Sequence, residues 1–175
     1  MSGRDGSHRA RELVLIPVRW SGLALAAGLA AHGMWVESAV AMLVALAQVV
    51  GWRWRLPQPW EVATSTVCMI AAISSFLLLY ERIPWWDVPM HFALTGLLAV
   101  LVTRVACSTS PSGAEVVVTG IVLAVVWELM ELAGGRWVDS SVDVAPSDTA
   151  LDLVAALAGT VAAALLWRRR DGARP

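Results

Sequence analysis

Residues 114–133 read AEVVVTGIVLAVVWELMELA, a stretch in which apolar side chains occupy nearly every face of a helix. A helix needs about 20 apolar residues to cross the hydrocarbon core of a bilayer, so this stretch predicts a membrane span. Glu128 and Glu131 interrupt it near its end and share one face, because they are three residues apart. Carboxylates inside a span are costly unless they are protonated, paired or bound to a cation. The pair therefore indicates a functional site.

The composition of the whole chain supports the same class of protein. Of the 175 residues, 58% are hydrophobic and only 15% are charged, whereas a soluble domain is about 45–50% apolar. The polar stretches are too short to form a separate soluble domain. No phosphate-binding glycine loop, catalytic serine motif or zinc-protease motif occurs, and nothing indicates a nucleic-acid partner. We therefore predict an integral membrane protein whose first partner is the lipid bilayer.

The remaining apolar stretches have similar lengths and predict an all-α, polytopic fold with six transmembrane helices. The predicted spans are 13–31, 34–51, 61–80, 88–107, 114–133 and 148–167. They form one predicted transmembrane domain, 13–167, between an N-terminal tail, 1–12, and a basic tail, 168–175. A cleaved signal peptide is the alternative interpretation of the first span. It is disfavoured because the apolar stretch is long and another span follows at once.

The positions of the basic residues orient these spans. All thirteen are arginines, and with the N-terminus in the cytoplasm eleven lie on the cytoplasmic side, leaving Arg82 and Arg136 outside. The positive-inside rule therefore predicts that both termini and both tails are cytoplasmic. Arginine without lysine, together with abundant Ala, Val and Leu, suggests a GC-rich bacterial genome. We expect the protein in the bacterial cytoplasmic (inner) membrane.

Two other spans carry ionisable residues at the same end as the glutamate pair. Asp87 and His91 open the fourth span, and Asp148 and Asp152 open the sixth, each pair four residues apart. In the predicted orientation all these groups lie on the outer side, within one or two helical turns of the surface. The sequence thus predicts one site in the outer half of the bilayer.

The residue types in this predicted site favour acid–base or metal chemistry. We expect four catalytic residues: His91, Glu128, Glu131 and Asp152. We expect six metal ligands: Asp87, His91, Glu128, Glu131, Asp148 and Asp152. Carboxylates and imidazole suit a divalent cation such as Mg²⁺, Mn²⁺ or Zn²⁺. Such a site would activate water or polarise a phosphate or carbonyl of a lipid-linked substrate in the outer leaflet. Without metal, a glutamate pair with separated pKa values would serve as acid and base.

Other interpretations of the same residues stay open at this point. Asp87 would serve as a helix N-cap, Asp148 as an acid favoured by the helix dipole, and His91 as a hydrogen-bonded core residue. Intramembrane acids also mark ion- or proton-coupled transporters, although the inner halves of the spans carry acids only at their very ends, Glu61 and Glu115. A scaffold subunit would neutralise its acids with Arg82 or Arg136. The sequence leaves the substrate and the oligomeric state open.

Three segments that contain the predicted site resemble a known family. WWDVPMHFALTG (85–96), WELMELAGG (127–135) and SDTALDLVAALAGTVAA (147–163) resemble small bacterial membrane proteins of the YjdF type. This resemblance covers about residues 80–167. The region is also distantly similar to the VanZ-like family, whose pattern is matched by four residues: Asp87, His91, Glu128 and Asp152. Glu131 and Ala156 depart from that pattern, which favours the YjdF type. The resemblance implies a multi-span inner-membrane protein without settled chemistry.

Overall fold

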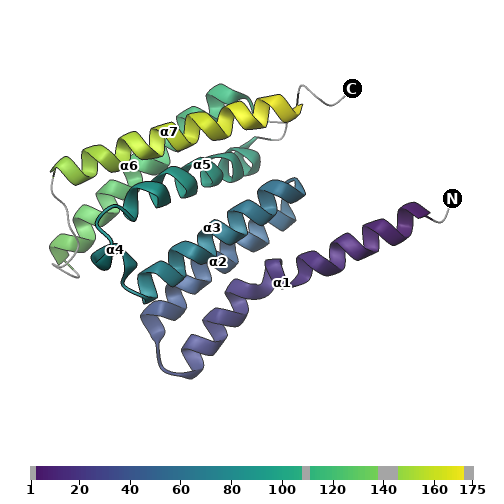
Figure 1. Cartoon of the computed structure of the whole chain (residues 1–175), viewed down its shortest axis with the longest axis horizontal. Helices are drawn as coiled ribbons and strands as arrows, with labels where there is room; N and C mark the ends of the chain where they lie inside the picture. The colour runs from purple at the N-terminus through teal and green to yellow at the C-terminus, as the bar shows by residue number, and fades with distance from the viewer. Residues whose placement is uncertain (1–2, 108–110, 138–145, 172–175) are drawn as a thin grey trace. The chain divides into compact units, whose positions relative to one another are not determined.

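The computed structural model describes residues 3–107, 111–137 and 146–171, and all regular elements within them are helices (Figure 1). The described residues form seven: α1 (Gly3–Ala31), α2 (Trp35–Arg53), α3 (Gln58–Phe76), α4 (Leu79–Arg82), α5 (Asp87–Ala106), α6 (Gly113–Trp137) and α7 (Pro146–Asp171). The all-α class is confirmed. The helices group into two compact units, Met1–Leu78 and Leu79–Pro175.

In the first unit, α2 packs against both α1 and α3 around several buried polar groups. The Arg19 guanidinium forms a buried ion pair with Glu61, using both Nε and Nη2 as donors. The Gln48 side chain accepts a hydrogen bond from the Gly22 amide and donates one to the Ser21 hydroxyl, both at 3.0 Å. These polar residues of apolar helices therefore satisfy one another inside the unit.

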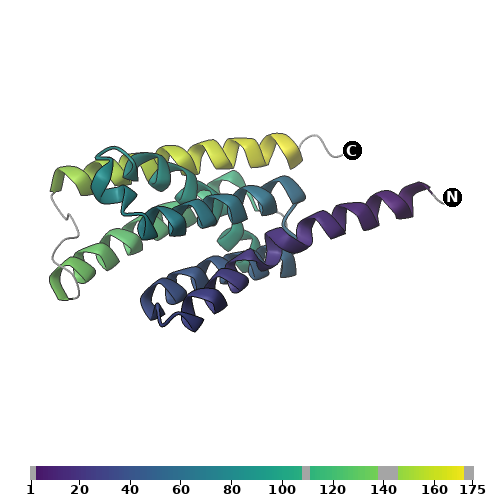
Figure 2. The same ribbon diagram turned by 60° about the horizontal axis from the view of Figure 1, so that its bottom comes forward.

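In the second unit, α5, α6 and α7 each contact the other two (Figures 1 and 2). The contact between α5 and α7 is close because glycines face each other. A Cβ at Gly159 would overlap the carbonyl oxygen of Phe92 and lie 2.6 Å from its carbonyl carbon. A Cβ at Gly96 would lie 2.5 Å from the carbonyl oxygen of Gly159. Small residues thus allow the two backbones to approach closely, as is common in membrane helix pairs.

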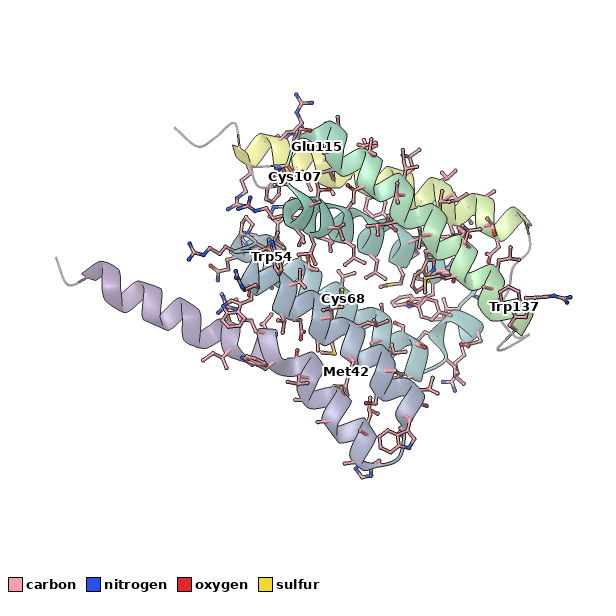
Figure 3. The ribbon with its side chains drawn as sticks, turned by 180° about the vertical axis from the view of Figure 1, so that it is seen from behind. Met42, Trp54, Cys68, Cys107, Glu115 and Trp137 are labelled. Atoms are coloured by element: carbon pink, nitrogen blue, oxygen red, sulfur yellow. The ribbon has the colours of Figure 1, made fainter. Side chains whose placement is uncertain are left out.

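The path of the chain gives this unit two chemically different ends. α6 runs antiparallel to α5 and α7, so the start of α5, the end of α6 and the start of α7 meet at one end (Figure 1). Figure 3 shows Glu115 and Trp137 at opposite ends of α6. Four arginines lie at the end of the unit that contains Glu115, in the last turns of α5 and α7: Arg104, Arg168, Arg169 and Arg170. The predicted site residues belong to the opposite end.

Four of the helices are long and apolar enough to cross a membrane. These segments are Trp35–Arg53, Asp87–Ala106, Gly113–Trp137 and Ser147–Arg170. They correspond to four of the six predicted spans. The apolar part of α1, Leu15–Ala31, is shorter than these segments, and α3 begins with polar residues, including Glu61. The structure therefore supports membrane insertion of the chain through these four helices.

The observed helix boundaries differ from the predicted ones at several points. The third predicted span, 61–80, is interrupted after Phe76 because Leu78 has a positive φ of 55°, and α4 follows as a separate short helix. The segment 134–147 between the fifth and sixth predicted spans is helical up to Trp137 and again from Pro146, and residues 138–145 lie outside the described residues. Within the predicted tails, residues 3–12 belong to α1 and residues 168–171 belong to α7.

Candidate functional site

Asp87 and His91 are placed together by the first turn of α5. The helix begins at Asp87, and Trp86 occupies the N-cap position without a capping side chain. One turn later, His91 Nε2 lies 3.2 Å from Asp87 Oδ1. The carboxylate of Asp87 therefore faces the imidazole, and the N-cap role considered from the sequence falls to Trp86.

His91 lies between carboxylates from α5, α6 and α7. Its side chain is 7% exposed, with Nδ1 3.9 Å from Oε1 of Glu128 on α6 and Nε2 4.0 Å from Oδ2 of Asp152 on α7. The Asp152 side chain is only 3% exposed. The imidazole therefore lies among carboxyl oxygens from α5, α6 and α7, at a position that little solvent reaches.

All six predicted ligands take part in three overlapping groups. In each group, one ligand atom per residue lies within 4.8 Å of the others. The groups are Asp87–His91–Glu131, His91–Glu128–Asp152 and Asp87–Asp148–Asp152. The structure thus brings together the residues that helical spacing singled out. Their roles as ligands or catalytic groups remain predictions.

Two oxygen atoms within these groups are buried and have no hydrogen-bond partner. They are Oε1 of Glu128 and Oδ1 of Asp152. Buried polar atoms are nearly always satisfied, so an unsatisfied pair needs a physical reason. Within residues 3–107, 111–137 and 146–171, no salt bridge joins an arginine to either carboxylate. Arg82 and Arg136, the partners that a scaffold would need, are exposed and form no such bridge in the same ranges.

Residues 12–172 match the family described as "Predicted membrane protein (DUF2238)". The chain belongs to this family. It is the YjdF-type family that the three sequence segments resembled, whereas the VanZ-like resemblance stays a prediction. No curated protein and no solved structure matches the chain.

The spacing of the groups in this DUF2238 chain fits a hard or borderline divalent cation. Oxygen and nitrogen ligands lie about 2.0–2.6 Å from such ions, so ligands on opposite sides of one ion are about 4–5 Å apart. The mutual distances of up to 4.8 Å within each triad are compatible with that range. An acid–base site without metal would use the same residues, because four carboxylates, those of Asp87, Glu128, Glu131 and Asp152, share a group with the imidazole.

Sequence analysis missed two residues beside the cluster. Tyr80 on α4 is the only tyrosine of the chain. Burial, reinforced by the negative charges of Asp87 and Glu131, raises the pKa of its phenol to about 12. Trp86, next to Asp87 in the chain, has a buried indole Nε1 without a hydrogen-bond partner. The predicted third span ends at Tyr80, and the sequence does not indicate the break at Leu78 that places Tyr80 on α4, beside the cluster.

Proposed function

We propose that this chain is a metal-dependent membrane enzyme that acts on a lipid-linked substrate at the outer leaflet. The observation that carries the proposal is the buried His91 between Glu128 and Asp152, each of which has an unsatisfied oxygen. A divalent cation would satisfy those oxygens and offset the charge of the neighbouring carboxylates. The ligand set of carboxylates and one imidazole favours Mg²⁺, Mn²⁺ or Zn²⁺.

The proposal includes six membrane crossings in the bacterial inner membrane, with both termini in the cytoplasm. Besides the four apolar helices, α1 and α3 would each cross once. Although α3 is less apolar, Glu61, Thr64 and Ser74 are all buried, so its polar groups face protein. The four arginines at one end of the second unit favour the cytoplasmic side for that end. The cluster at the opposite end then lies in the outer half of the bilayer.

The proposed reaction is hydrolysis of a phosphate or carboxylate ester of a lipid. The cation would supply Lewis-acid polarisation of the substrate oxygen and lower the pKa of water. The water oxygen forms a bond to phosphorus or to the carbonyl carbon, and the bond from that atom to the departing oxygen breaks. One proton passes from the water to the departing oxygen. Glu131 is the candidate carrier because its carboxylate belongs to the triad of Asp87 and His91.

The transporter alternative receives less support from the described residues. A conduction path requires available polar groups at both depths of the membrane. Several buried groups of the first unit are engaged with each other, since Arg19 pairs with Glu61 and Gln48 bonds to Gly22 and Ser21, whereas the Thr64 hydroxyl is buried without a partner. These contacts favour a structural role for that polar interior.

The test combines metal content with turnover. The full chain is purified into lipid nanodiscs, stripped with EDTA, and supplied with Mn²⁺ and phosphate- or ester-bearing lipids, with products followed by mass spectrometry. We expect Mn²⁺-dependent hydrolysis that Glu128→Gln and His91→Ala abolish. Glu81→Gln, which changes an exposed acid on α4, should retain it. A protein that binds no divalent cation would refute the proposal. Cation-driven uptake into liposomes without hydrolysis would favour the transporter.

A further inference from the structure

We infer that the cluster holds two divalent cations and that Asp152 bridges them. This inference rests on the proposed function and specifies the stoichiometry of its site. Two of the three triads, His91–Glu128–Asp152 and Asp87–Asp148–Asp152, share only Asp152. They therefore define two ligand sets that share one carboxylate.

The two oxygens of Asp152 have the environments that a bridging carboxylate needs. Oδ2 lies 4.0 Å from Nε2 of His91, which belongs to the first set. Oδ1 is buried and has no hydrogen-bond partner, although the Asp152 side chain is 97% buried. A single cation bound through one oxygen would leave the other oxygen without compensation. A cation on each side would satisfy both.

The orientation of His91 agrees with this division. Nδ1 is the ring nitrogen nearer to Glu128, at 3.9 Å, and Nε2 lies 3.2 Å from Asp87. Metal-bound histidines usually donate their other ring N–H to a carboxylate, which fixes the ring. His91 and Glu128 would therefore bind the first cation. Asp87 would accept a hydrogen bond from Nε2 and bind the second cation together with Asp148.

The balance of charge also favours two cations over one. The four carboxylates of Asp87, Glu128, Glu131 and Asp152 carry four negative charges when ionised, so one divalent ion leaves two charges uncompensated and two ions balance all four. Outside the masked segments, no arginine forms a salt bridge with Asp87, Glu128, Glu131 or Asp152. Uncompensated like charges at close range in a weakly hydrated site are strongly unfavourable. The second cation removes most of that repulsion.

The test counts Mn²⁺ ions on the purified full chain in nanodiscs. After EDTA stripping and equilibrium dialysis against Mn²⁺, we expect two ions per chain and an exchange-coupled Mn²⁺ signal in electron paramagnetic resonance. Asp148→Asn and Glu128→Gln should each retain one ion with an uncoupled signal. Asp152→Asn should lose the coupling and bind fewer ions than either. Glu81→Gln should retain two coupled ions.

The outcomes separate this inference from the proposed function. One ion per chain, lost in Glu128→Gln but retained in Asp148→Asn, overturns the two-cation site and leaves a mononuclear enzyme. No bound ion overturns both. Two ions that persist in Asp148→Asn overturn the assignment of the second ligand set. Asp148 is only half-buried, so its amide variant should fold and keeps the test decisive.

Discussion

Replacing Gly159 by alanine tests whether the close contact between α5 and α7 positions the cluster. The new Cβ would overlap the carbonyl oxygen of Phe92 and lie 2.6 Å from its carbonyl carbon, whereas ordinary contacts begin at 3.4 Å. The helices must therefore separate by at least about 0.8 Å, and overpacking of this kind costs about 1–3 kcal/mol. Phe92 directly follows His91, so the separation also moves the imidazole away from Asp152.

Gly134 provides a matched control for this substitution. It lies in α6, and a Cβ there meets no atom within 4 Å. Both variants gain about 1 kcal/mol of helix propensity from Gly→Ala, so their difference isolates the overlap at Gly159. Metal sites tolerate ligand displacements of about 0.2 Å. Gly159→Ala should therefore weaken Mn²⁺ binding at least about tenfold, while Gly134→Ala should leave it unchanged.

The assay measures thermal unfolding and Mn²⁺ affinity of both variants in the same nanodiscs. We expect Gly159→Ala to unfold at least about 2 °C below Gly134→Ala, as a difference of 1 kcal/mol or more requires. Equal unfolding temperatures and equal Mn²⁺ affinities would refute the reasoning, because the α5–α7 contact would then not position the site.

Four further predictions address the charges and the orientation. Glu128→Gln should weaken Mn²⁺ binding at least about tenfold. It should preserve or raise the stability of the metal-free protein, because it removes one of several like charges. The control Glu81→Gln should change neither the binding nor the stability. EDTA should lower the unfolding midpoint of the wild type, since a cation at 100 times its Kd adds about 2.7 kcal/mol; an unchanged midpoint would contradict the cation site. Arg19→Met should cost about 3–5 kcal/mol because it leaves Glu61 buried without its partner. The double change with Glu61→Met should recover most of that loss in thermal melts, and no recovery would argue against the pair. Cys107, near Glu115 at the arginine end (Figure 3), should react with a membrane-impermeant maleimide only in inside-out vesicles; labelling of intact cells would reverse the proposed orientation.

The grouping of the six site residues was accessible from the sequence for simple geometric reasons. Spacings of three and four place each pair on one helical face, and alternation of chain direction places all pairs at one end. What spacing leaves open is the rotation of each helix about its axis. That rotation depends on close contacts such as those at Gly96 and Gly159. The spacing of apolar residues along the sequence does not show how closely the helices approach at these positions. The division of the carboxylates into triads therefore emerged only from the structure.

The helix boundaries were less accessible because they depend on single backbone positions. The fifth predicted span ends before Gly134, yet α6 continues to Trp137. Gly134 and Gly135 therefore do not stop the helix. Conversely, Leu78 is an apolar residue in the left-handed region, and nothing in its side chain signals the break that creates α4. Hydropathy also does not reveal that Glu61 of α3 has a buried partner. The partner, Arg19, is far from Glu61 in the sequence.

The central claim is that the cluster around His91 binds divalent cations. The most direct measurement is an anomalous-difference map from crystals of the full chain equilibrated with Mn²⁺. We predict density adjacent to His91 and Asp152, within ligand distance of Glu128. A map without density there, or coordinates in which these three side chains lie beyond reach of a common ion, would contradict the account.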